Sequence, residues 1–158
     1  MRWDACSAAA PHTALKLALC LERKEIYLEQ ILKKFTLEFF GKGKHKILPE
    51  KFFETENGFL LDVRSKEEAG SLFFRMDYHP NIECRNIPID EIPDRIDEIP
   101  HDASIAVFCS GTARSTIAYI YLLSKGYSNV RIIVGGYPAL TEALMPGKVL
   151  KALQNNKE

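Results

Sequence analysis

The sequence has no excess of charge of either sign and no long apolar run. Lys and Arg together number 21, and so do Asp and Glu, which gives a net charge of zero. Proteins that bind nucleic acid usually carry a strong basic excess, so this balance argues against a nucleic-acid partner. No apolar stretch reaches the roughly 18 residues of a transmembrane helix, and we therefore expect no membrane span.

The sequence also lacks a metal-binding pair of cysteines. Cys6, Cys20, Cys84 and Cys109 form no Cys-x-x-Cys motif, and the four histidines lie too far apart for a zinc site. Scattered cysteines in a chain of this length are typical of reduced cytosolic thiols rather than of a disulfide framework. We therefore expect a cytoplasmic protein without a metal ion.

The first twenty residues contain some features of a signal peptide, with Arg2 followed by alanines and leucines. Pro11 and Lys16 interrupt the apolar stretch. The bulky Leu19 precedes Cys20, where a lipoprotein cleavage site needs a small residue. We therefore expect neither a signal peptide nor a lipid anchor.

The 158 residues suit one domain of average size with an appendage. Residues 1–44 carry a net charge of about +3 and residues 45–158 about −3 by counting charged side chains. The change of sign falls at Gly41-Lys42-Gly43-Lys44, a natural flexible joint. We predict an N-terminal helical extension over 1–44 and a main domain over 45–158.

The extension contains apolar residues at helical spacing. Their three- and four-residue intervals predict one apolar face on a helix from about Thr13 to Phe40, either continuous or broken in two. The face consists of Leu28, Ile31, Leu32, Phe35 and Phe39. It either packs on the main domain or forms an oligomer or partner surface. We favour a helix that packs on the core and contributes to a homodimer.

From His45 onward, short β-rich runs alternate with helical stretches. This alternation predicts an α/β fold in three layers, with a mostly parallel sheet of about five strands between helices. The predicted strands are 46–48, 59–63, 84–87, 104–109 and 130–134. The predicted helices are 49–55, 65–74, 90–99 with an interruption at Pro93, and 115–125.

The most informative stretch is the strand and loop around Cys109. The strand 104–108 is nearly all apolar and runs directly into the cysteine. Ligands of α/β sheets bind at the carboxyl ends of strands, which is where Cys109 lies. A cysteine in this position is often buried and inert. The loop that follows changes this interpretation.

The loop after Cys109 is suited to holding an anion. Ser110, Gly111 and Ala113 are small enough to let the loop curl around the sulfur with its N–H groups pointing inward. The next helix adds its positive N-terminal end, and Arg114 adds a cation. These donors favour thiolate over thiol and stabilise an anion bound to it. We predict that Cys109 is a nucleophile.

Four segments in this order resemble the rhodanese-like family of sulfurtransferases over residues 45–158. Each segment is weak evidence alone, but their order makes a specific signal. They are Phe59 to Glu68, His79 with the later Asn86-Ile87-Pro88-Ile89, Cys109 to Ser115, and Val134 to Leu140.

The resemblance implies a sulfurtransferase that works by double displacement. Cys109 takes a sulfane sulfur from thiosulfate, a persulfide or a polysulfide, and passes it to cyanide, a thiol or a sulfur-accepting protein. No cofactor is implied. The substrate-binding residues are expected to be Ser110, Gly111, Thr112, Ala113, Arg114 and Ser115.

The loop departs from the family pattern at two positions. Ser110 stands where the family often has Arg, and Thr112 stands where it often has Gly. The loss of a cation weakens the expected binding of the thiosulfate dianion. A persulfide or polysulfide donor therefore becomes a more serious alternative, while the enzyme is still expected to resemble a thiosulfate sulfurtransferase (rhodanese).

Two other functions use the same fold. Dual-specificity phosphatases resemble this loop but use Cys-x5-Arg, whereas Cys109 to Arg114 is a shorter Cys-x4-Arg loop. The short loop favours sulfur over phosphate. The second alternative is a low-turnover sulfur carrier or regulatory module that binds a partner through its N-terminal helix.

Several other residues are candidates for supporting roles. Asp62 caps the loop or pairs with a buried base, and Arg64 lies in a surface pair. Arg114 either reaches the substrate or turns back to a carboxylate such as Asp62. We expect Cys84 to be a bystander rather than a resolving thiol, and His79 to be structural.

Gly135 and Gly136 are expected to form a tight turn near the active loop, because glycine adopts backbone conformations that other residues avoid.

Overall fold

The computed structural model describes residues 28–145 and 147. The chain divides into two compact units, one ending at Phe35 and one beginning at Thr36, and each is described by itself. The expectations about a signal peptide and a lipid anchor concern residues outside the described ones.

The first unit is helical over residues 28–33. Ile31 is buried, whereas Leu28 and Leu32 are 43% and 51% exposed. The chain leaves the helix at Lys34, and Thr36 then caps a new helix, α2 (Leu37–Gly41), by accepting a hydrogen bond from the Phe39 N–H at 3.2 Å. The predicted helix is therefore broken in two, and its part before residue 28 lies outside the described residues.

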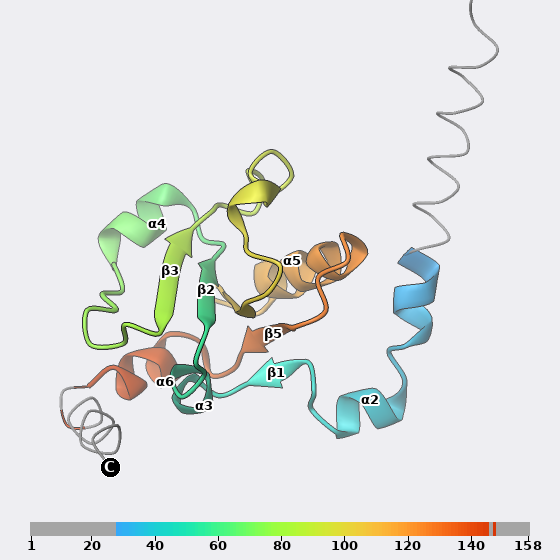
Figure 1. The fold of residues 1–158 in the computed structure, drawn as a ribbon, viewed down its shortest axis with the longest axis horizontal. Coiled ribbons are helices and arrows are strands. Elements are labelled where there is room, and N and C mark those ends of the chain that lie inside the picture. Colours follow the sequence, from blue (N-terminus) through green and yellow to red (C-terminus); the bar gives the residue numbers. More distant parts are fainter. Residues whose placement is uncertain (1–27, 146, 148–158) are drawn as a thin grey trace, which may run out of the picture. The chain divides into compact units, whose positions relative to one another are not determined.

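The second unit contains a five-stranded, wholly parallel sheet (Figure 1). The strands lie in the order β1-β5-β4-β2-β3, so β1 and β3 form the two edges. Their bounds lie within two residues of those predicted. They are β1 (Lys46–Ile47), β2 (Gly58–Asp62), β3 (Ile82–Asn86), β4 (Ser104–Phe108) and β5 (Val130–Ile133).

Local sequence signals determine several helix ends in this unit. Pro49 opens α3 (Pro49–Phe53), where the missing N–H costs nothing. Ser65 and Glu68 form a capping box at the start of α4 (Lys66–Ser71). Past the end of α5 (Ala113–Ser124), Gly126 takes a positive φ of 91°. The last described helix is α6 (Gly136–Ala143).

The predicted helix over 90–99 is wrong. The structure has turns there and a single short 3₁₀ helix, Ile96–Glu98. The cause is Pro93, which lacks an N–H and disfavours the helical conformation of the residue before it.

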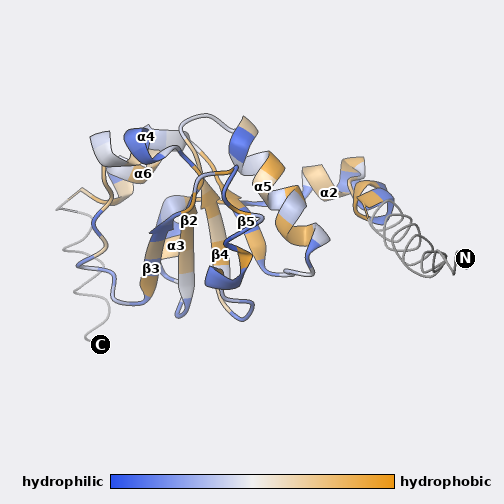
Figure 2. Cartoon of the chain, turned by 90° about the horizontal axis from the view of Figure 1, so that it is seen from above, coloured by the Kyte–Doolittle hydropathy of each residue, from blue (hydrophilic) through white to orange (hydrophobic). Residues whose placement is uncertain are grey.

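Buried apolar residues lie on both faces of the sheet, and hydrophobic colours run along the strands in Figure 2. One face packs on α3 and α6, which lie side by side in Figure 1. Ala106 and Phe108 of β4 belong to that core, and Ile105 and Val107 alternate to the other face. Because α5 contacts β4 and β5 and contributes nothing to the first core, it covers this second face. The three-layer α/β prediction is confirmed.

The sheet register brings two chain segments together. Asp62 at the end of β2 is the partner of Phe108 at the end of β4. The residues that follow each strand, Arg64 and Cys109 among them, therefore leave the same edge of the sheet.

None of the helices between residues 28 and 145 has the length and apolar composition of a membrane span.

Candidate active site

Cys109 lies at the junction of β4 and α5. The residue is only 4% exposed, because it follows a buried central strand. Its thiol donates to the Gly111 carbonyl oxygen at 2.6 Å and lies 3.4 Å from Ser115 Oγ. The Ser115 N–H, in the first turn of α5, donates to the sulfur at 3.4 Å. A helix N-terminus leaves such N–H groups without intrahelical partners, and here one is directed at the thiol.

Ser115 is held in this position by its own side chain. Its hydroxyl donates to the Thr112 carbonyl oxygen at 3.0 Å, and the residue is buried. The prediction that the N–H groups of the loop point at the sulfur is wrong for Gly111, which presents its carbonyl oxygen and so accepts from the thiol. Ser110, Gly111, Thr112 and Ala113 are exposed. The loop therefore forms the open side of the site, and Ser115 forms its buried side.

Arg114 turns back to a carboxylate, which is one of the two predicted arrangements. The carboxylate is Glu68 rather than Asp62. Arg114 donates to both Glu68 oxygens, at 2.5 and 2.8 Å, and to Ser110 Oγ at 2.8 Å. The hydrogen bond from Arg114 lowers the pKa of Glu68 to about 2, with a further contribution from the Ser65 N–H. Both side chains are about one third exposed.

Sequence reasoning recognised Glu68 only as a capping residue. That role is real, since Glu68 accepts from the Ser65 N–H at 3.1 Å while its own N–H donates to Ser65 Oγ. The carboxylate thus fixes the start of α4 and the loop after β4 together. No local signal distinguishes this second role.

Asp62 pairs with a buried base, as one prediction stated, and that base is Arg64. The prediction of a surface pair for Arg64 is wrong, because the residue is fully buried. Arg64 Nη2 lies 2.6 Å from Asp62 Oδ2, and Arg64 Nε lies 2.8 Å from Asp62 Oδ1. Burial of this charge is compensated by the bidentate carboxylate and by carbonyl acceptors at Glu68 and Leu72.

Three aromatic rings surround the Arg64 guanidinium. Its central carbon lies 5.0, 5.3 and 4.9 Å from the ring centroids of Phe74, Phe108 and Tyr137. Tyr137 also accepts a hydrogen bond from Arg64 Nη1. Phe108 directly precedes Cys109, so this cluster supports the strand end that carries the candidate nucleophile.

The Gly-Gly turn lies beside the loop, as predicted. Gly135 has a φ of +85°, and a Cβ on it would lie 2.4 Å from Ala139 Cβ. A Cβ on Gly136 would lie 3.5 Å from the Ser110 carbonyl oxygen. At the end of β3, Asn86 Nδ2 donates to the carbonyl oxygens of Asp62 and Arg64 at 3.0 and 2.9 Å, and so holds the segment that follows β2.

Cys84 and His79 have the environments of structural residues. Burial and the charge of Asp62 raise the pKa of the Cys84 thiol to about 12, so it stays protonated at neutral pH. His79 is buried and stacks on Phe53 with ring centroids 4.5 Å apart. Burial lowers its pKa and favours the neutral imidazole. Among the residues that the structure describes, no three His, Cys, Asp or Glu side chains gather as metal ligands.

Comparison with known proteins places this site in a family. The family described as "Rhodanese-like domain" matches residues 47–143. A sulfurtransferase of Allochromatium vinosum is 29% identical over 99 residues, which cover 63% of this chain and 86% of that protein. A tRNA sulfurtransferase of Haemophilus influenzae is 28% identical over 78 residues, 49% of this chain but only 16% of that longer protein.

A solved structure supports the same assignment. A rhodanese-related protein of Thermoplasma volcanium superposes with a TM-score of 0.51 at 26% identity, covering 65% of this chain and 95% of the other. The chain belongs to the rhodanese-like family. The family-level prediction of a sulfurtransferase fold is therefore confirmed.

Proposed function

We propose that this protein is a sulfurtransferase in which Cys109 carries the transferred sulfur as a persulfide. The observation that supports this most is the position of the Cys109 sulfur, buried at the end of β4 and accepting a hydrogen bond from the Ser115 N–H of α5. Ser110, Gly111, Thr112, Ala113, Arg114 and Ser115 bind the substrate, with Asp62 and Arg64 as supporting residues.

The reaction proceeds in two displacements. The Cys109 thiolate attacks the sulfane sulfur of the donor, and the donor's S–S bond breaks with its electron pair leaving on the departing group. A Cys109 persulfide results. A cyanide or thiol acceptor then attacks the outer sulfur, and the Cys109 thiolate leaves. The first turn of α5 stabilises the negative charge in both states.

We propose a persulfide or polysulfide as the donor in preference to thiosulfate. Arg114, the cation of the loop, already makes two hydrogen bonds to Glu68. Glu68 also places a negative charge beside Ser110, which lies 3.3 Å from it. A thiosulfate dianion therefore meets a neutralised cation, whereas a monoanionic persulfide needs less compensation.

Phosphate transfer is the weaker alternative. The six residues from Cys109 to Arg114 form a shorter loop than the Cys-x5-Arg pattern. A low-turnover sulfur carrier remains the second alternative. A steady-state assay with a persulfide donor and a cyanide acceptor, run beside an aryl phosphate, separates the three. Sulfur transfer faster than phosphate release supports our proposal, and the reverse order contradicts it. A persulfide that forms without turnover indicates a carrier.

Three further expectations remain proposals. We propose a rhodanese-like domain over 45–158 with an extension over 1–44. We also propose a cytoplasmic location, because Cys84 and Cys109 are free thiols and the cytoplasm keeps thiols reduced. We also propose that the extension contributes to a homodimer, since Leu28 and Leu32 are exposed. Light scattering that gives the mass of one chain would contradict the dimer.

A further inference from the structure

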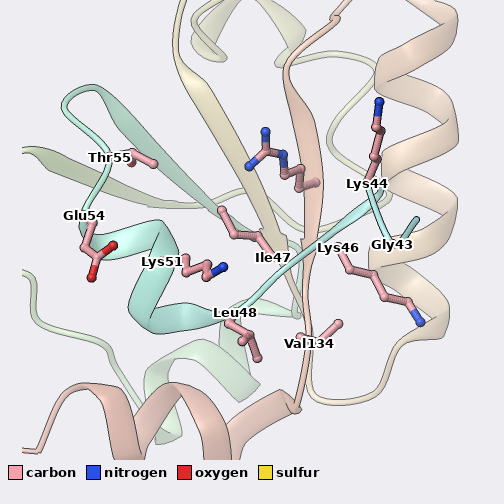
Figure 3. A pocket seen from close by; sticks show the side chains of 10 residues that line it. Gly43, Lys44, Lys46, Ile47, Leu48, Lys51, Glu54, Thr55 and Val134 are labelled. Carbon is pink, nitrogen blue, oxygen red and sulfur yellow. The ribbon is translucent and has the colours of Figure 1, made fainter. Parts of the chain in front are cut away.

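A basic hollow lies along the edge strand β1, beside α3 and β5 (Figure 3). Its volume is about 1020 Å³, near the upper end of the range for ligand sites. Four cations and one carboxylate contribute to its lining, in a chain whose net charge is zero. The cations are Lys44, Lys46, Lys51 and Arg131, and the carboxylate is Glu54.

None of the four cations is neutralised within the described chain. The salt bridges there involve other lysines and arginines, including Lys42, Lys66 and Arg95. In Figure 3 the Lys51 side chain points from α3 toward β1 and Glu54 points away from the strand, whereas Lys46 points to the opposite side of β1 from Lys51. The hollow therefore carries a net positive charge among the described residues, with Glu54 as the one carboxylate in its lining.

Arg131 lies on the face of β5 that packs on the core, but at a position that the core does not cover. Ile133 is buried in the core beneath α3 and α6, and Arg131 shares its face because strand residues alternate. Arg131 is nevertheless exposed. Its side chain enters the hollow rather than the core.

The hollow also has apolar and backbone features. Ile47, Leu48 and Val134 line it, and Leu48 is 50% exposed. Within the described chain β1 pairs with β5 alone, and on its outer edge the Lys46 N–H already donates to the Gly43 carbonyl oxygen, so the edge is only partly available for backbone pairing. An open strand edge accepts an extended peptide through backbone hydrogen bonds, with adjacent pockets selecting the side chains.

The hollow is also near the candidate active site. Val134 lines it and is followed by Gly135 and Gly136. A Cβ on Gly136 would lie 3.5 Å from the Ser110 carbonyl oxygen. Since all the strands are parallel, the carboxyl end of β1 lies at the same edge of the sheet as Cys109, with β5 between β1 and β4.

We propose that this hollow docks an acidic, extended segment of a partner protein that exchanges sulfur with Cys109. Carboxylates pair with Lys51 and Arg131, and an intervening apolar side chain packs on Leu48 and Val134. The identity of the partner as a sulfur donor or acceptor rests on the proposed function. The acidic docking site itself rests only on the hollow.

The test measures binding without sulfur chemistry. A fluorescein-labelled peptide of alternating Glu and Leu is titrated into the full-length protein at low salt and followed by fluorescence anisotropy. The counterpart with Lys in place of Glu, and an oligouridylate of equal charge, are the comparison probes. The double variant Lys51→Glu/Arg131→Glu is compared with Arg75→Glu/Lys125→Glu, which makes the same charge change outside the hollow.

We expect the acidic peptide to bind the wild type and the control variant, and the hollow variant to bind about tenfold more weakly or worse. Equal binding by both variants, or no binding by the wild type, overturns the proposal. Tighter binding of the oligouridylate with the same loss in the hollow variant overturns the choice of a peptide.

The same proteins separate this proposal from the proposed function. Transfer from a small persulfide to cyanide should be unchanged in the hollow variant, because none of its residues contacts Cys109. Peptide binding without any persulfide on the wild type would contradict sulfur transfer and leave the docking site standing. Persulfide formation without peptide binding would contradict the docking site and leave sulfur transfer by Cys109 standing.

Discussion

Glu68 joins the helix after β2 to the loop after β4, because both of its carboxylate oxygens accept hydrogen bonds from Arg114. The two residues are 46 positions apart in the chain. This pair fixes the outer rim of the cysteine loop and offsets the positive charge of Arg114. Our proposal for the sulfur donor depends on this pair.

Replacing Glu68 by Gln should improve the use of thiosulfate. The neutral amide keeps a capping group for Ser65 but releases Arg114 from its charge pair. We expect the KM for thiosulfate to fall by about tenfold, since one compensating charge becomes available to the dianion. The KM for a persulfide should change less. Glu67→Gln is the matched control, because Glu67 precedes Glu68 on α4 but does not bond Arg114. An unchanged KM for thiosulfate in Glu68→Gln would show that the pair does not select the donor.

The pair should also make stability depend on pH in a defined acidic window. The folded pKa of Glu68 is about 2, below the ordinary value of 4.5, so the unfolded chain binds the proton more tightly. Its contribution is therefore fully present above about pH 4.5 and is lost as the pH falls toward 2. Melting temperatures of wild type and Glu68→Gln should differ by a constant amount at neutral pH and converge in this window. A difference that persists at pH 2 would contradict the assignment.

Arg64 should be the charged residue whose replacement costs most. Arg64→Leu leaves Asp62 buried without its partner, for which we expect a loss of about 3–5 kcal/mol in the free energy of unfolding. Denaturant titration measures it. Arg75→Gln serves as the control, because the Arg75 side chain is 80% exposed and should change stability by less than about 0.5 kcal/mol. Equal effects in the two variants would disprove the role of the buried pair.

The sequence predicted those features that depend on nearby residues. The apolar strand before Cys109, the capping residue Ser65 and the Gly-Gly turn are encoded locally, and all three are present. The Arg64 prediction failed because burial of a guanidinium requires rings and carbonyls from distant segments. Tyr137, for example, is 73 residues away.

The Glu68–Arg114 pair was missed for a similar reason. Its formation depends on β2 and β4 being neighbours in register, and the sequence alone does not fix that pairing. The capping box at Ser65 and Glu68 already accounted for the carboxylate, so nothing in the pattern required a second partner.

Two glycines near the loop should respond differently to alanine. Gly135 has a φ of +85° and would place a Cβ 2.4 Å from Ala139 Cβ, whereas a Cβ on Gly111 would meet nothing within 4 Å. We expect Gly135→Ala to lower the free energy of unfolding by at least about 1–2 kcal/mol. Gly111→Ala should remain within about 0.5 kcal/mol of wild type. Thermal or denaturant unfolding measures both, and a stable Gly135→Ala variant would contradict the described turn.

The central claim is that Cys109 carries the transferred sulfur. The most direct test incubates the protein with a small persulfide donor, traps the product with an alkylating reagent and maps its peptides by mass spectrometry. We expect the alkylated peptide that contains Cys109 to be heavier by about 32 Da, one sulfur atom, than the same alkylated peptide from protein without donor. Cys109→Ser should lose the adduct, and Cys84→Ser should retain it. An adduct of the same yield in Cys109→Ser, or its loss in Cys84→Ser alone, would contradict the account.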